Sequence, residues 1–181
     1  MPESGETVRT FVAVLLSEAA AREAERLLDR LRPLARRCRW VTRAQLHITL
    51  RFLGELSPAA VERVRSAVAA VTVQPFDIEL HRAGAFPNLA RPRTLWLGGD
   101  RGAPELTALA GRVNDALFGV GIPRNDRPFS PHLTLARSDG LPLPPALMRE
   151  LERVPSVAWR CSDISLMRSR LTPRGSVYTR L

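Results

Sequence analysis

The stretch QLHITLRFLGE, residues 45–55, decides the fold, because it places a histidine inside what otherwise reads as a buried strand. Its apolar and polar residues alternate, which is the pattern of a strand with one face in the core. The string His-x-Thr-Leu returns in SPHLTLARS, residues 130–138. Two of the three histidines in the chain, His47 and His132, lie in these strings. The repeated string therefore predicts two equivalent strands, each presenting a histidine and a threonine on one face.

The same order of elements surrounds both strings. Residues 9–34 and 93–122 each predict a strand followed by a helix, residues 57–71 and 144–154 each predict a helix opened by proline, and residues 75–80 and 157–171 each return to strand. Matching landmarks keep nearly the same offset: 84 residues from Arg9 to Arg93, 85 from His47 to His132 and 86 from Pro58 to Pro144. We predict a duplicated β-α-β-α-β unit, over about 7–83 and 93–171, related by approximate two-fold symmetry within a single bilobed domain, 1–181.

Alternation of strands and helices could also indicate a parallel, doubly wound sheet. That fold is disfavoured, because VAVLLSEAA runs from the first strand directly into its helix without a glycine-rich phosphate loop. The run RWVT, residues 39–42, also precedes the next strand by only a few residues, as the strands of a hairpin do. We therefore predict an α+β fold with mainly antiparallel sheets and a cleft between the two lobes.

Regular alternation predicts which side chains face that cleft. His47, Thr49 and Arg51 should share one face of the first strand, with Ile48, Leu50 and Phe52 on the other. In the second copy, His132 and Thr134 should share a face, while Arg137 points away from His132 unless a bulge turns it inward. The two-fold relation would bring both polar faces to one groove.

Two imidazoles and two hydroxyls in one groove suit acid–base chemistry on a phosphodiester. An unperturbed histidine has a pKa near about 6.5, so one ring can be neutral and the other protonated at neutral pH. The neutral ring can take a proton from water, and the protonated ring can give one to the departing oxygen. The alternatives are two core histidines or a metal site, but neither motif contains a carboxylate. We expect neither a metal nor another cofactor.

The charge of the chain favours a polyanionic partner. The net charge is +9, and all 27 basic residues are arginine, whose planar fork of donors suits phosphate. Replacement of lysine by arginine through genomic bias would explain the missing lysine but not the positive excess. No apolar run approaches the roughly 18 residues of a membrane span, and the N-terminus has no signal-peptide pattern. The two isolated cysteines, Cys38 and Cys161, fit a reducing compartment, so we expect a cytoplasmic protein.

At these residues the chain resembles the two-histidine (2H) phosphoesterase superfamily, and within it the RNA 2′,3′-cyclic phosphodiesterases, historically called 2′-5′ RNA ligases. The resemblance covers nearly the whole chain. It rests on LHITLRFLGE after RWVT, on RAGAFPNLARPRTLWLG at 82–98, on RPFSPHLTLAR at 127–137 and on SRLTPRGSVYTRL at the C-terminus.

The resemblance implies hydrolysis of a terminal 2′,3′-cyclic phosphate on RNA to a 2′-phosphomonoester, without a metal. It implies that His47 is the proton donor, His132 the proton acceptor, and Thr49 and Thr134 the phosphate-binding hydroxyls. The residues alone do not decide which ring is the acid. Four arginines are candidate substrate-binding residues: Arg51, Arg127, Arg137 and Arg174.

Three other functions remain open at this point. The chain could act chiefly as a 2′-5′ RNA ligase, or as a 2H phosphodiesterase on a small cyclic nucleotide or a 2′-5′ oligonucleotide. It could also be an RNA-binding module without chemistry. The expected partner is RNA with 2′,3′-cyclic phosphate ends, and we expect a monomer with no obligate protein partner.

Overall fold

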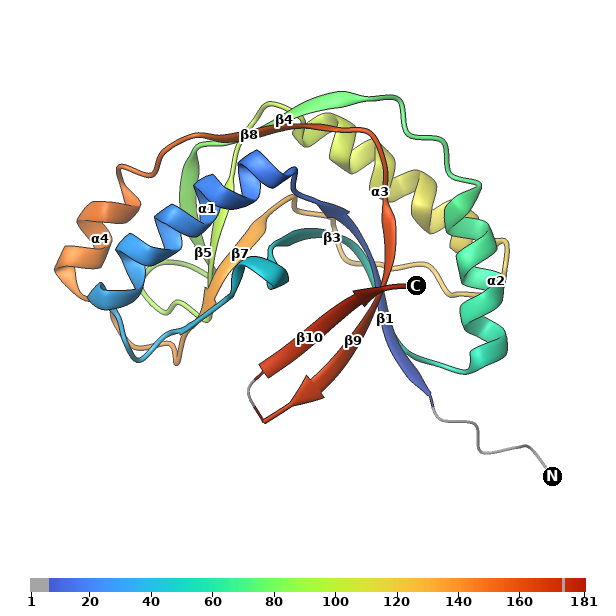
Figure 1. Ribbon diagram of the computed structural model, residues 1–181, viewed down its shortest axis with the longest axis horizontal. Coiled ribbons are helices and arrows are strands. Elements are labelled where there is room, and N and C mark those ends of the chain that lie inside the picture. Colours follow the sequence, from blue (N-terminus) through green and yellow to red (C-terminus); the bar gives the residue numbers. More distant parts are fainter. Residues whose placement is uncertain (1–6, 174) are drawn as a thin grey trace.

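The computed structural model describes residues 7–173 and 175–181 (Figure 1). Its helices are α1 (Glu18–Leu31), α2 (Pro58–Ala69), α3 (Ala103–Phe118) and α4 (Pro145–Leu151), with short 3-10 turns η1 (Arg32–Leu34) and η2 (Arg43–Gln45). Its strands are β1 (Val8–Leu15), β2 (Arg39–Trp40), β3 (His47–Leu56), β4 (Phe76–Leu80), β5 (Arg82–Phe86), β6 (Thr94–Gly98), β7 (Leu133–Arg137), β8 (Val157–Cys161), β9 (Ser165–Thr172) and β10 (Gly175–Arg180).

The larger sheet is arranged symmetrically about the two histidine-bearing strands. Its order is β10-β9-β1-β3-β7-β6-β5, with β2 paired to β7, and β4 and β8 form a second, two-stranded sheet. Strands β3 and β7 adjoin through Ile48 and Leu133. From that junction outward, β1 matches β6 and β9 matches β5. All the strand pairs among the described residues are antiparallel, so the predicted antiparallel α+β fold with paired lobes is confirmed.

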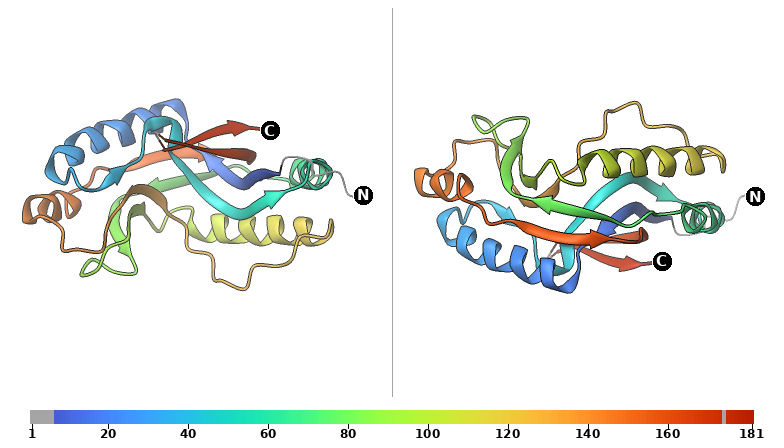
Figure 2. Two further views of the ribbon diagram at one scale, coloured as in Figure 1. Left: turned by 90° about the horizontal axis from the view of Figure 1, so that it is seen from below. Right: turned by 90° about the horizontal axis from the view of Figure 1, so that it is seen from above.

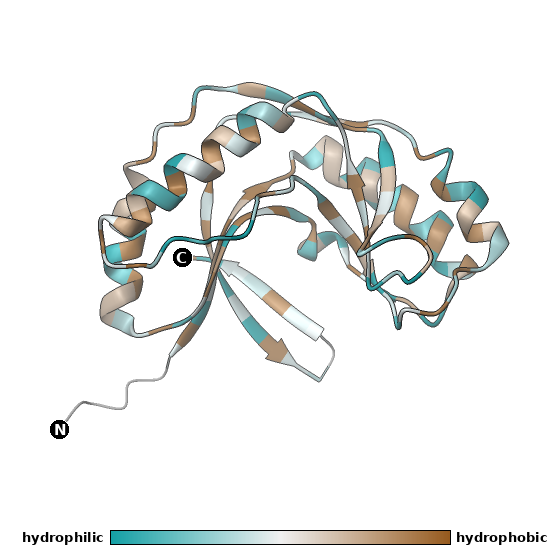
Figure 3. Cartoon of the chain, turned by 180° about the vertical axis from the view of Figure 1, so that it is seen from behind, coloured by the Kyte–Doolittle hydropathy of each residue, from teal (hydrophilic) through white to brown (hydrophobic). Residues whose placement is uncertain are grey.

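The helices pack apolar stripes against the sheets. The buried stripe of α1 consists of Ala20, Ala24, Leu27, Leu28 and Leu31, and that of α3 of Leu106, Leu109, Ala110, Val113 and Leu117. Figure 3 shows this banding of hydrophobic and hydrophilic residues along the helices. Ser17 and Ser57 cap α1 and α2 through their side-chain oxygens, which accept hydrogen bonds from Ala20 N and Ala60 N. None of the helices in the described ranges is long and apolar enough to span a membrane.

The helices lie along the outer side of an arch, and the β9–β10 hairpin projects from its inner side (Figures 1 and 2).

The predicted pairing of residues 39–42 with the strand that follows them is wrong. The run 39–42 does not form a hairpin with the following strand, because η2 intervenes and β2 pairs with β7 instead. Strand β2 therefore joins the first half of the chain to the second, beside the histidine strands.

Each histidine strand contains a β-bulge at the same place. In the β1–β3 ladder, Ala13 pairs with Thr49 and Val12 with Arg51, so Leu50 is left without a partner. In the β6–β7 ladder, Trp96 pairs with Thr134 and Leu95 with Ala136, so Leu135 is left over. A bulge resets the alternation of side chains beyond it. The residues after each His-x-Thr string therefore do not face as regular alternation predicts.

Candidate active site

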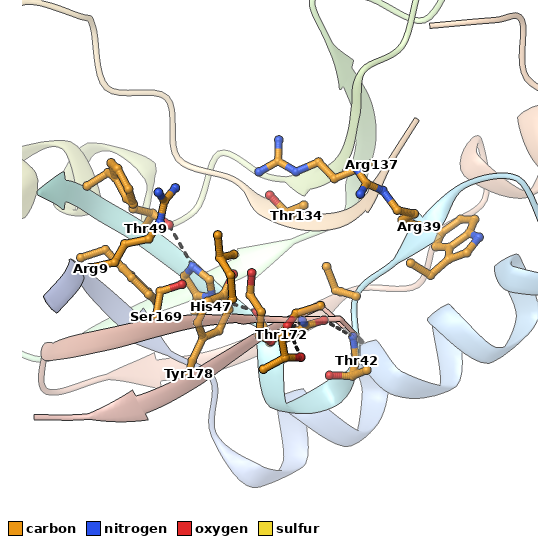
Figure 4. A pocket seen from close by; sticks show the side chains of 18 of the residues that line it. Arg9, Arg39, Thr42, His47, Thr49, Thr134, Arg137, Ser169, Thr172 and Tyr178 are labelled. Atoms are coloured by element: carbon orange, nitrogen blue, oxygen red, sulfur yellow. Dashed lines mark hydrogen bonds between the residues drawn. The ribbon is translucent and has the colours of Figure 1, made fainter. Parts of the chain in front are cut away.

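Both histidines and both motif threonines line one cavity of about 1040 Å³. Strands from both halves form its walls, and the β9–β10 hairpin supplies one side (Figure 4). The lining residues are Arg9, Phe11, Arg39, Trp40, Val41, Thr42, Gln45, His47, Thr49, Phe52, His132, Thr134, Arg137, Ser169, Leu171, Thr172, Pro173, Gly175, Ser176 and Tyr178. The structure thus brings together the four motif residues that lie 85 positions apart in pairs.

Each of the two imidazoles is held by an equivalent hydrogen bond to a backbone carbonyl. Nδ1 of His47 lies 2.8 Å from the carbonyl oxygen of Gln45, and Nδ1 of His132 lies 2.7 Å from that of Ser130. Because a carbonyl oxygen only accepts, each ring carries a proton on Nδ1 and donates it. Nε2 of each ring is then the atom available for proton transfer. In His47 this nitrogen lies 2.9 Å from Oγ1 of Thr49.

Aromatic side chains fix the orientation of both rings. His47 packs against Phe11, with ring centroids 4.7 Å apart, and edge-on against Tyr178 at 5.2 Å. His132 packs edge-on against Phe86 at 4.9 Å, and Phe86 in turn packs against Trp96 at 5.2 Å. These contacts hold the imidazoles in place without fixing their charge.

Burial shifts the pKa of both histidines in the same direction. Burial lowers the pKa of His47, the hydrogen bond to the Gln45 carbonyl opposes this, and the nearby positive charges of His132 and Arg137 lower the pKa further. Burial also lowers the pKa of His132, with the charge of Arg137 adding to it and the Ser130 carbonyl opposing. Both rings are therefore mostly neutral at pH 7 when the cavity holds no anion. A bound phosphate would raise both pKa values.

The bulges determine which side chain beyond each His-x-Thr string faces the cavity. Beyond Leu135 the bulge turns Arg137 into the cavity, where its Nη1 also donates to Thr94 Oγ1 at 2.6 Å. Beyond Leu50 the equivalent bulge turns Phe52 into the cavity instead of Arg51. Phe52 is 50% exposed, and the Arg9 guanidinium lies 4.7 Å from the centre of its ring. One side of the cavity therefore ends in a cation and the other in an aromatic ring.

The remaining candidate arginines lie elsewhere. The placement of Arg51 on the face of His47 is wrong, because the bulge at Leu50 reverses it, and its Nη2 donates to the Pro123 carbonyl at 2.6 Å. Arg127 is exposed in the loop before β7 and does not line the cavity. Arg174 lies outside the described residues.

Sequence reasoning missed several residues that line the cavity. Arg9, Arg39, Ser169 and Tyr178 come from strands whose pairing the sequence does not reveal, and Phe52 was predicted on the opposite face from His47 because regular alternation does not include the bulge at Leu50. Only Phe52 had a usable signal, because it lies 85 residues before Arg137 and so occupies the equivalent place in the repeat.

The cavity is positively charged. Its lining contains three arginines and two histidines, but no aspartate or glutamate among the described residues. Such a surface attracts phosphate. Across the described ranges, no group of three or more His, Cys, Asp or Glu side chains is gathered as metal ligands would be.

Comparison with known proteins identifies relatives of the chain. The family model of the 2′-5′ RNA ligase superfamily matches residues 17–173. An RNA 2′,3′-cyclic phosphodiesterase of Methanothermobacter thermautotrophicus is 34% identical over 177 residues, 95% of each chain. One of Aeropyrum pernix is 38% identical over 138 residues, 75% of this chain and 78% of the relative.

Solved structures share the fold. A Thermus thermophilus protein superposes with a TM-score of 0.78 at 32% identity, covering 96% of this chain and 94% of that one. Escherichia coli LigT, crystallised with 3′-AMP, gives a TM-score of 0.77 at 26% identity, covering 97% and 96%. With the family model spanning most of the sequence, the chain belongs to the 2′-5′ RNA ligase superfamily.

Proposed function

We propose that this protein hydrolyses the 2′,3′-cyclic phosphodiester at the end of an RNA strand to a 2′-phosphomonoester. The observation that carries the proposal is the pair of imidazoles in one cavity without carboxylates among its described residues, each anchored through Nδ1 to a backbone carbonyl two residues upstream. The names of the Methanothermobacter and Aeropyrum relatives support the same reaction.

In the proposed reaction, neutral His132 accepts a proton on Nε2 from a water molecule, whose oxygen forms a bond to phosphorus. The bond between phosphorus and O3′ breaks, and protonated His47 delivers its Nε2 proton to O3′. The products are a 2′-phosphomonoester and a free 3′-hydroxyl. The two rings exchange protonation states in one turnover and reset through solvent. The assignment of His47 as the acid follows the family resemblance.

Three further side chains have roles in this proposal. Thr49 and Thr134 donate hydrogen bonds from their hydroxyls to the non-bridging phosphate oxygens, where negative charge grows. Arg137, which donates to the neutral Thr94 hydroxyl, has further N–H donors for the same oxygens. The half-exposed ring of Phe52 offers a face for stacking of the terminal base.

An oligonucleotide with a 2′,3′-cyclic phosphate end tests the reaction directly. The expected product is the 2′-monoester, identified by phosphorus NMR. His47→Ala and His132→Ala should each lower kcat by about 10²–10⁴-fold while RNA binding persists. The control is His81→Ala, which removes the third, exposed histidine and should leave turnover unchanged. Formation of the 3′-monoester, or full turnover by either motif variant, would contradict the proposal.

The reaction should not depend on a metal ion, since two imidazoles supply both proton transfers. We expect the rate to be the same with and without EDTA. Loss of turnover that returns on addition of a divalent cation would replace this mechanism by a metal-assisted one. We also propose that the protein acts as a cytoplasmic monomer, which light scattering and cell fractionation would check.

A further inference from the structure

Two arginines of the cavity lie directly opposite each other on neighbouring strands. Arg39 of β2 pairs with Arg137 of β7, and opposed residues of an antiparallel pair project from the same face. Both line the cavity. Like charges in this position destabilise a sheet, so the pair costs stability unless an anion lies between or beside them.

No carboxylate offsets this charge within the described residues. Neither Arg39 nor Arg137 belongs to any of the ion pairs found there, and Arg39 is exposed without a side-chain hydrogen bond in that part of the chain. Arg137 lies near the motif threonine of its own strand, so its charge serves the reacting phosphate. Arg39 is then a second cation that has no role in the proposed reaction.

The backbone that carries Arg39 is nevertheless held firmly. The Val41 amide donates to the carbonyl of Leu135, the bulged residue of β7, at 2.9 Å. The indole Nε1 of Trp40 donates to the Ala35 carbonyl at 3.0 Å. Arg39 thus combines an exposed guanidinium with a backbone that is anchored at the next two residues. This arrangement is typical of a preorganised binding residue.

The position of Arg39 identifies the group it can bind. Figure 4 places Arg9 and Arg39 at opposite ends of the cavity, with His47, Thr134 and Arg137 between them. Arg9 covers Phe52, the ring proposed for the terminal base. In a nucleotide the base and the 5′-oxygen leave the ribose at opposite ends, while the 2′ and 3′ oxygens lie between them. A terminal ribose over the histidines, with its base toward Phe52, therefore directs its 5′-oxygen toward Arg39.

We propose that Arg39 binds the phosphate on the 5′ side of the terminal nucleotide. The site then selects the end of an oligonucleotide, or a 5′-phosphorylated nucleotide, over a cyclic nucleoside phosphate that lacks this group. The inference rests on the proposed function for the orientation of the ribose, and it extends that function to the substrate class.

The test uses adenosine 2′,3′-cyclic phosphate with and without a 5′-phosphate. Wild type should favour the 5′-phosphorylated compound in kcat/KM. Arg39→Gln should lower kcat/KM for that compound by about 10- to 100-fold, the effect of losing a hydrogen bond to a charged group, and leave the other compound unchanged. Arg36→Gln is the matched control. It removes the same charge from an exposed residue that does not line the cavity, and should alter neither substrate.

Equal losses on both compounds in Arg39→Gln, or the same losses in Arg36→Gln, would overturn the inference. Binding of the two products, adenosine 2′-phosphate with and without a 5′-phosphate, separates this failure from failure of the proposed function. If wild type hydrolyses neither these compounds nor an oligonucleotide with a 2′,3′-cyclic phosphate end, the hydrolytic function is wrong. A selective loss of affinity for the bisphosphate in Arg39→Gln would still support the phosphate site, and equal affinities in wild type and variant would refute it.

Discussion

A backbone carbonyl two residues upstream fixes which nitrogen of each motif histidine is free. The carbonyls of Gln45 and Ser130 accept the Nδ1 protons, so both Nε2 atoms are presented to the cavity in the same tautomer. Two rings of the same tautomer and similar burial can exchange the roles of acid and base. The asymmetry needed for catalysis must therefore come from the substrate and from the residues around the rings.

The lowered pKa values of these rings have a kinetic consequence. In the free enzyme both His47 and His132 titrate below the usual value of about 6.5, so the optimum of kcat/KM should lie on the acid side of that value. A bound phosphate stabilises the protonated form, so the optimum of kcat should lie at higher pH. Both profiles should be bell-shaped. A pH series of initial rates checks this, and a kcat/KM optimum above that of kcat would contradict it.

A glycine linked to the second histidine through two aromatic rings gives a structural test. A Cβ on Gly84 would lie 2.3 Å from the Trp96 ring, whose neighbour Phe86 packs on His132. Gly84→Ala should therefore lower the free energy of unfolding by about 1–3 kcal/mol and also lower kcat, because the displaced rings move the imidazole. Urea unfolding and turnover measure the two effects.

The control for that variant is another glycine-to-alanine change. Gly111 lies within α3, and a Cβ there would meet nothing within 4 Å. Gly111→Ala should raise the free energy of unfolding by about 0.5–1 kcal/mol and leave kcat unchanged. Equal stability of the Gly84 and Gly111 variants would mean that the Trp96 contact does not constrain the site.

Prediction from sequence succeeded for residues whose neighbours in the chain determine their environment. The His-x-Thr strings predicted that two histidines and two threonines would share one groove, and all four line the cavity. The arginines were harder to place. Arg51 bonds the Pro123 carbonyl and Arg39 enters the cavity for reasons that depend on residues far away in the sequence.

At the scale of elements, the paired bulges explain this limit. Whether Leu50 and Leu135 bulge depends on the register of the neighbouring strands β1 and β6, which no pattern within β3 or β7 reveals. A single unpaired residue exchanged Arg51 for Phe52 at the cavity. The repeat itself carried the missing information, because a bulge that turns Arg137 inward requires the same of the residue 85 positions earlier.

One side chain ties the β9–β10 hairpin to the rest of the site. Gln45 Nε2 donates to the Ser176 carbonyl at 2.7 Å, and the hairpin contributes Ser169 and Tyr178 to the cavity. Gln45→Ala should raise KM for RNA by about 2- to 10-fold, the value of a neutral hydrogen bond, with little change in kcat. Steady-state kinetics measure this.

The control for the hairpin variant separates local from global stability. Ser57→Ala removes the cap of α2, outside the cavity lining, and should cost about 1 kcal/mol of stability without a change in KM. If both variants raise KM alike, the effect of Gln45→Ala comes from general destabilisation and the hairpin tie has no role in binding.

At the scale of the whole molecule, the sheet is symmetric but its cavity is not. The strands next to β3 and β7, β1 and β6, occupy equivalent places in the sheet. Equivalent positions on β3 and β7 nevertheless carry different side chains, Phe52 and Arg137. The symmetric frame places two similar rings together, and in our proposal the unequal ends orient a substrate that is itself asymmetric. The repeat boundaries, 7–83 and 93–171, stay a prediction.

The buried histidines also link stability to pH. Both folded-state pKa values are lowered, so the unfolded chain binds protons more readily in acid. This contribution to stability is intact above about pH 6.5 and is lost as the pH falls through the folded values. Urea unfolding between about pH 7.5 and 5 should show a flatter pH dependence in a His47→Gln, His132→Gln double variant. An unchanged slope in the double variant would contradict the linkage.

Salt dependence reports how many phosphates of the substrate the molecule contacts. The chain carries a net charge of +9, and among the described residues three arginines line the cavity, where a strand end would bind. Each neutralised phosphate of a single strand contributes about −0.7 to the slope of log affinity against log salt. A longer oligonucleotide product should therefore show a steeper slope than adenosine 2′-phosphate, and Arg39→Gln should make it shallower by about 0.7. Arg36→Gln should retain the full slope. If the mononucleotide and the oligonucleotide show equal slopes, the enzyme contacts the terminal phosphate alone, and the excess positive charge does not contribute to RNA binding.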